Sequence, residues 1–148
     1  MRILLDTNIW VSAFLSPEGN CGRLIHQLLS DGDIEIVTSA SILDEIVDVL
    51  ARPRLTRRYS FTPDEVKQFV AWIWAAAQIV IPLADSYGCR DRDDDIVCAA
   101  AVAGRARYLV TRDDDLKRDP ALMQTLGALG LEVITVSGLE RLVGLIVG

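Results

Sequence analysis

Acidic side chains follow two of the strands that the sequence predicts. Asp6 comes directly after the apolar run 3–5, and Asp113 comes shortly after the run 108–111. A carboxylate at the inner end of a buried strand is costly unless a cation or a hydrogen-bond donor meets it. The alternative role for Asp6 is to cap the next helix. Because Asn8 suits that cap, we expect Asp6 to be functional.

Two other segments each offer a carboxylate. Asp95 is the acid nearest to a long apolar helix, and Asp93 is the second choice. Acids at a helix start complement the helix dipole, but one or two are enough for that role. In the helix after the second strand, Glu45 lies at the margin of the apolar stripe, although an ordinary surface Glu would fit there too. Asp115 is an alternative to Asp113.

Four carboxylates in one pocket repel one another, and some would bind protons unless a cation were present. A site made of oxygen atoms favours Mg²⁺, or Mn²⁺ in its place, over zinc, and the chain has a single histidine. Asp6, Asp95 and Asp113 are the predicted metal ligands. Glu45 is expected to orient the attacking water or to recruit a second ion. This chemistry is phosphodiester hydrolysis.

The elements that must position these residues alternate in type. Strands are predicted at 2–6, 34–38, 78–82, 108–111 and 131–136. Helices are predicted at 8–15, 22–30, 41–51, 63–77, 94–103, 120–127 and 138–147. Such alternation is typical of an α/β sandwich with a parallel sheet, in which ligands bind outside the carboxyl ends of the strands. The length of 148 residues, without a repeat or a linker, predicts one domain over 1–148.

Composition limits the cellular compartment and the substrates that we expect for the chain. No apolar run is long enough to span a membrane. Cys21, Cys89 and Cys98 lack the spacing of a zinc site, so we expect them to be buried, reduced thiols of a cytoplasmic protein. Seven of the 21 acidic residues lie between positions 91 and 115. The acidity is therefore local and does not exclude a nucleic-acid substrate.

Four segments resemble, in order, the motifs of PIN-domain nucleases, especially the VapC-like toxins of bacterial toxin–antitoxin systems. They are 6–13 (DTNIWVSA), 41–45 (SILDE), 93–100 (DDDIVCAA) and 109–116 (LVTRDDDL). The resemblance implies a Mg²⁺-dependent endoribonuclease on a three-layer α/β/α sandwich with a mostly parallel sheet of about five strands. It places the family's acidic quartet at Asp6, Glu45, Asp95 and Asp113. It also implies a small cognate antitoxin as a partner and a homodimer or higher oligomer.

Other polar residues are expected to position the site or to hold RNA. Positioning roles are assigned to Thr7, Asn8, Ser12 and Thr111. The segment 52–59 carries four arginines and no acid, in a chain of formal net charge −6, and arginine binds phosphate bidentately. The arginines assigned to RNA are Arg52, Arg54, Arg57 and Arg58, with Tyr59 and Phe61 stacking on unpaired bases. The alternative is a solvated connection whose arginines pair with nearby acids.

Two other functions belong to different classes. An aspartate-based phosphatase would also carry its nucleophile at Asp6, but it needs a second Asp where this chain has Asn8. A PIN-fold binding module without turnover is expected to have lost at least one of the four acids, and all four are present.

Overall fold

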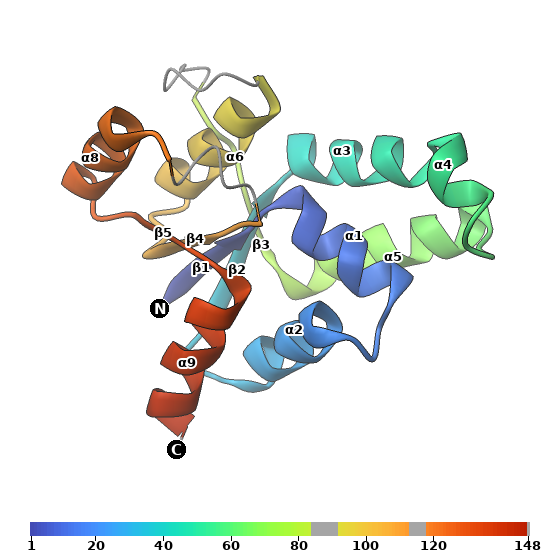
Figure 1. The fold of residues 1–148 in the computed structure, drawn as a ribbon, viewed down its shortest axis with the longest axis horizontal. Helices are drawn as coiled ribbons and strands as arrows, with labels where there is room; N and C mark the ends of the chain where they lie inside the picture. The colour runs from blue at the N-terminus through green and yellow to red at the C-terminus, as the bar shows by residue number, and fades with distance from the viewer. Residues whose placement is uncertain (84–91, 113–117, 148) are drawn as a thin grey trace.

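A computed structural model describes residues 1–83, 92–112 and 118–147. Its five strands form one sheet in the order β3-β2-β1-β4-β5 (Figure 1). The strands are β1 (Arg2–Leu5), β2 (Glu35–Ser39), β3 (Gln78–Val80), β4 (Tyr108–Val110) and β5 (Glu132–Ile134). All the neighbouring strands pair in parallel, so their carboxyl ends share one edge of the sheet. The predicted α/β class with a parallel sheet is confirmed.

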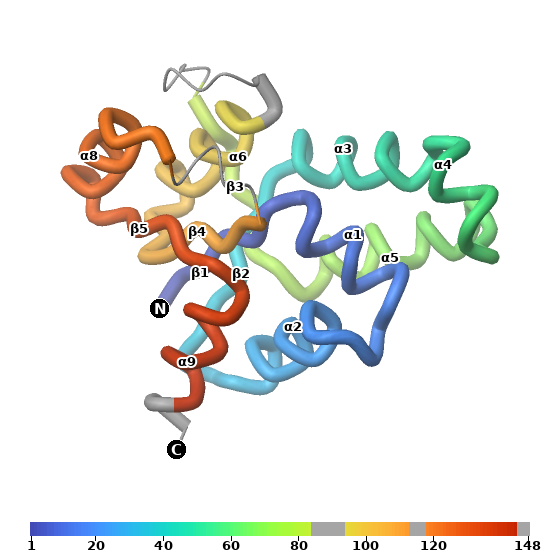
Figure 2. Tube along the Cα trace, in the orientation of Figure 1, coloured from blue at the N-terminus to red at the C-terminus, as the bar shows by residue number. Residues whose placement is uncertain are grey.

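Helices cover both faces of the sheet and make three layers (Figures 1 and 2). On one side lie α6 (Arg92–Ala103) and α8 (Pro120–Ala128), and on the other lie α1 (Thr7–Leu15), α2 (Asn20–Ser30) and α9 (Val136–Val147). Three more helices extend away from the sheet: α3 (Ala40–Leu50), α4 (Pro53–Thr56) and α5 (Pro63–Ala76). None of the helices in the described ranges has the length and apolar character needed to cross a bilayer.

The most apolar segments are those enclosed on every side. Ile3, Leu4 and Leu5 of β1 are fully buried because helices cover both faces of this central strand. Residues 97–101 of α6 are also buried without interruption, as expected for a helix that is apolar all round. This packing fixes α6 firmly against the sheet, where it contacts β1, β2 and β4.

Element boundaries differ from the prediction by one or two residues. The first strand ends at Leu5 because Asp6 already caps α1, and the last strand ends at Ile134 because α9 begins at Val136. The helices α2 and α6 each begin two residues earlier than predicted. The helix α4, a single turn that starts with a proline, was not predicted.

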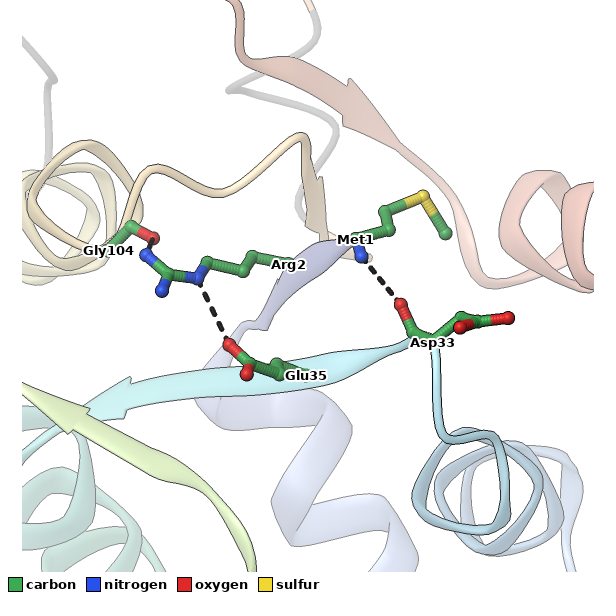
Figure 3. A network of polar contacts seen from close by, with 5 residues as sticks. All are labelled: Met1, Arg2, Asp33, Glu35 and Gly104. Carbon is green, nitrogen blue, oxygen red and sulfur yellow. Dashed lines mark hydrogen bonds and ion pairs between the residues drawn. The ribbon is translucent and has the colours of Figure 1, made fainter.

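The amino edge of the sheet carries a polar network, drawn in Figure 3. Arg2 donates from Nε to a carboxylate oxygen of Glu35 at 3.1 Å and from Nη1 to the carbonyl oxygen of Gly104 at 3.2 Å. The amino group of Met1 donates to the carbonyl oxygen of Asp33 at 2.6 Å. Because Gly104 follows the end of α6, the first turn of α6 must lie toward the opposite, carboxyl edge of the sheet.

Candidate active site

Asp6 lies where β1 turns into α1 and is only 6% exposed. Its Oδ1 accepts a hydrogen bond from the backbone N–H of Thr7, and its Oδ2 accepts one from the Thr111 hydroxyl, both at 2.7 Å. Asp6 is therefore the N-cap of α1. The expectation that Asn8 caps this helix was wrong, since the helix starts at Thr7 and Asn8 is exposed. Asp6 has a structural role as well as the proposed chemical one.

Thr7 joins Asp6 to a carboxylate on another element. The Thr7 hydroxyl donates to Oε2 of Glu45 at 2.8 Å. Glu45 is half-buried on α3, whereas Asp44 and Asp48 of the same helix are exposed. The apolar periodicity of α3 therefore correctly predicted which of its three acids is partly buried, and this acid contacts Thr7. Hydrogen bonds link Glu45, Thr7, Asp6 and Thr111 in one chain.

The strand register explains why these segments meet. Leu5 of β1 pairs with Val110 of β4, so the next residue of each strand, Asp6 and Thr111, emerges at the same point of the carboxyl edge. The backbone N–H of Asp6 continues the ladder by donating to the carbonyl oxygen of Val110 at 3.0 Å. This is the edge of a parallel sheet at which ligands bind.

Of the other two acids of the predicted quartet, Asp95 and Asp113, the structure describes only the first. Asp95 is half-buried in the first turn of α6, at the end of that helix that points toward the carboxyl edge. Asp93 belongs to the same turn, and only its backbone is described. Asp113 and Asp115 lie outside the described residues. Within those residues, no three acidic, histidine or cysteine side chains are close enough to hold a metal ion together.

Arg112 connects the end of β4 to two helices, a role that the sequence analysis missed. Its guanidinium donates to Oγ of Ser12 on α1 at 3.3 Å and to Sγ of Cys21 on α2 at 3.2 Å. Ser12 is therefore a partner of Arg112, and its predicted positioning role at the acidic site stays a prediction. Burial raises the pKa of the Cys21 thiol, although Arg112 opposes this rise, so Cys21 stays neutral at pH 7. Cys21 and Cys98 are buried thiols outside any disulfide, as predicted. Cys89 lies outside the described residues.

The predicted RNA-binding arginines lie on and beside α4, at the far end of α3 from the site (Figure 1). All four are exposed. Nearby, a cavity of about 640 Å³ lies between α1, α2 and α5. Its aromatic lining includes Phe14, Tyr59, Phe61, Phe69 and Trp72. Phe61 packs edge-on against Phe14 with 5.2 Å between ring centroids, so its ring is part of the cavity wall.

The donor atoms at the carboxyl edge are oxygens, which fits a hard divalent cation. Each carboxylate oxygen has two lone pairs, so Asp6 can hold its two hydrogen bonds and still bind an ion. Mg²⁺ is typically bound by one or two carboxylates and keeps several waters. Asp6 with one further acid would therefore be sufficient. His26, the single histidine, is exposed on α2.

Two buried threonines offer a matched test of the Asp6 geometry. Thr111→Val removes the donor to Asp6, which should lower the free energy of unfolding by roughly 1.5–3 kcal/mol, because bonds to charged groups are the strong ones. Thr38 is equally buried, but its hydroxyl has no hydrogen-bond partner among the described residues. Thr38→Val should be neutral or stabilising. Thermal unfolding of both variants checks this, and equal losses would contradict the assigned role of Thr111.

Comparisons with known proteins identify the family and the fold of the chain. The family model described as PIN domain matches residues 2–115. The chain is 29% identical over 116 residues to the uncharacterized protein MJ1680 of Methanocaldococcus jannaschii, which covers 78% of this chain and 73% of that protein. The fold is similar to a chain in the crystal structure of VapBC2 from Rickettsia felis bound to a DNA fragment from their promoter. The TM-score is 0.62 at 19% identity, covering 91% of this chain and 98% of that chain. The chain belongs to the PIN domain family.

Proposed function

We propose that residues 1–148 act as one Mg²⁺- or Mn²⁺-dependent endoribonuclease. The observation that carries the proposal is the Asp6 carboxylate, buried at the carboxyl edge and joined through Thr7 to Glu45. Two carboxylates this close repel each other, and a bound cation offsets that repulsion. Membership of the PIN domain family, whose members are nucleases, supports hydrolysis of nucleic acid.

The residues of the site then have separate tasks. Asp6, Asp95 and Asp113 would hold the ion, and Asp93 and Asp115 are the alternatives on the same two segments. Glu45 orients the water whose oxygen forms a bond to phosphorus while the bond to the leaving oxygen breaks. When bound, the divalent ion supplies charge stabilisation at the phosphate and makes the water more acidic. Thr7 and Thr111 hold the carboxylates in position.

Digestion of single-stranded RNA by the purified chain tests this proposal. We expect cleavage with Mg²⁺ or Mn²⁺, no cleavage in EDTA, and recovery when the metal is added back. Single-stranded DNA of the same sequence is the comparison for substrate class. RNA that gains no new ends with either metal would contradict nuclease activity. A labile acyl phosphate on Asp6 after incubation with acetyl phosphate would instead support the aspartate-based phosphatase.

We further propose that the chain is the toxin of a toxin–antitoxin pair, acting in the cytoplasm as a homodimer or higher oligomer. The similarity to a chain of a VapBC2 structure supports this biological setting. The aromatic cavity offers an apolar surface for a protein partner, and Trp72 at its rim is 38% exposed. If the gene next to that of this chain encodes a small DNA-binding protein, co-expression with that protein should give a stable complex that no longer cleaves RNA. A complex that cleaves as fast as the free chain would contradict the toxin role.

A further inference from the structure

We infer that the arginines of residues 52–58 form a distal anchor for RNA, which makes cleavage depend on how far the strand extends past the scissile phosphate. The distal anchor consists of Arg52, Arg54, Arg57 and Arg58. The inference rests on the proposed function, because the anchor and the acidic site would hold the same RNA strand.

The charges of the distal anchor are available to a ligand. None of its four arginines forms an ion pair with any residue in the part of the chain that the structure describes. The nearest acids along the chain are exposed Asp48 on α3 and the first-turn residues Asp64 and Glu65 of α5. Glu65 is already bonded to the backbone N–H of Thr62 in a capping box. The alternative of arginines neutralised by acids therefore lacks support among the described residues.

One aromatic ring reinforces the distal anchor. The Arg58 guanidinium lies over the ring of Tyr59, 5.6 Å from its centroid. This contact orients the guanidinium without using its hydrogen-bond donors. An arginine held in this way keeps its planar fork of N–H groups for a phosphate.

The fold sets the separation between the distal anchor and the acidic site. α3 begins at the carboxyl edge of the sheet, where Ser39 caps it, and carries Glu45 beside Thr7. α4 lies at the other end of α3, away from the sheet (Figure 1). From Glu45 to Arg54 the chain advances nine positions, through the end of α3 at Leu50 and the start of α4 at Pro53, which at the helical rise corresponds to on the order of 14 Å. A stacked strand rises about 3.4 Å per nucleotide, so about four nucleotides would bridge the two regions.

The negative charge of the chain explains why RNA needs a contact with the protein besides the acidic site. A chain of net charge −6 repels RNA as a whole, and the acidic site adds to this repulsion until a cation binds. Each phosphate neutralised on a single strand contributes about −0.7 to the slope of log K against log[salt]. Two arginines that contact phosphate should thus account for a slope of about −1.4. Their loss should weaken binding at 50 mM salt by roughly 10–100-fold.

The test measures RNA binding separately from cleavage. In a non-cleaving Asp6→Asn background, the double variant Arg57→Gln/Arg58→Gln is titrated with a fluorescent 12-nucleotide single-stranded RNA at several salt concentrations. The matched control is Arg105→Gln/Arg141→Gln, which removes the same charge from exposed positions after α6 and on α9. We expect weaker binding and a shallower salt slope for the first pair alone. Equal slopes for the two pairs would overturn the inference.

Cleavage of RNAs of different length tests the separation between the distal anchor and the acidic site. With Asp6 intact, Arg57→Gln/Arg58→Gln should raise KM for the 12-nucleotide RNA several-fold more than KM for a dinucleotide, which is too short to bridge the two regions. An equal rise for both lengths would contradict a distal contact. Unchanged RNA binding together with lost binding of the co-expressed small protein would assign the segment to that protein instead. If RNA binds as expected but no variant cleaves it, the nuclease proposal fails while the distal anchor stands.

Discussion

Replacing Asp6 with Asn is expected to lower the rate of RNA cleavage at least about 100-fold while the chain stays folded. Asn keeps an oxygen for the Thr7 N–H, and its amide can bond the Thr111 hydroxyl, so the cap of α1 is retained. What is lost is the negative charge that attracts a divalent cation. A loss of about 3 kcal/mol of charge stabilisation at the phosphate corresponds to about 100-fold in rate.

The control for this variant is Asp33→Asn, which makes the same change of charge at the amino edge of the sheet. Asp33 is exposed, and its backbone carbonyl rather than its carboxylate accepts the bond from Met1 (Figure 3). Single-turnover cleavage and thermal unfolding are measured for both variants. Asp6→Asn should cleave slowly with a nearly unchanged unfolding temperature, and Asp33→Asn should match the wild type. Equal activities of the two variants would contradict the role of Asp6.

Gly22→Ala is expected to destabilise the fold strongly. A Cβ at Gly22 of α2 would clash with the carbonyl oxygen of Pro17, which is backbone and cannot rotate away. The segment before α2 must therefore shift, and overpacking of this kind costs about 1–3 kcal/mol. For a chain of this size the unfolding temperature falls by roughly 2–4 °C for each kcal/mol. A decrease of up to about 10 °C is expected.

Gly127→Ala is the matched control for the same substitution. Gly127 lies in α8, and a Cβ there would have no neighbour within 4 Å among the described residues. Alanine is the better helix former by up to about 1 kcal/mol, so this variant should be neutral or slightly more stable. Thermal unfolding followed by circular dichroism compares the two. A Gly22→Ala chain as stable as Gly127→Ala would show that α2 does not approach Pro17 this closely.

The sequence predicted the layers well because complete burial leaves a clear pattern. Residues 3–5 of β1 and 97–101 of α6 are enclosed from every side, and a segment enclosed in this way must be apolar throughout. Element ends were harder to predict. Asp6 and Asn8 are both good capping residues, and only the backbone geometry of the turn decides between them.

Parts of the candidate site could also be predicted from the sequence. The helical period of α3 singled out Glu45, and the structure places its carboxylate against Thr7. The bonds from Arg112 to Ser12 and Cys21 join residues about 100 positions apart, so no local pattern could reveal them. The choice between Asp113 and Asp115 stays a prediction, because adjacent acids after a strand have the same local signature.

Carboxylates from distant segments are expected to form one divalent-cation site at the carboxyl edge. Titration of the chain with Mn²⁺, followed by electron paramagnetic resonance of the free ion, measures this directly. We predict saturable binding that Asp6→Asn abolishes, that Asp33→Asn retains, and that Thr111→Val weakens by roughly 10–100-fold. Absence of saturable binding by the wild-type chain, or equally tight binding by Asp6→Asn, would contradict a shared cation site at this edge.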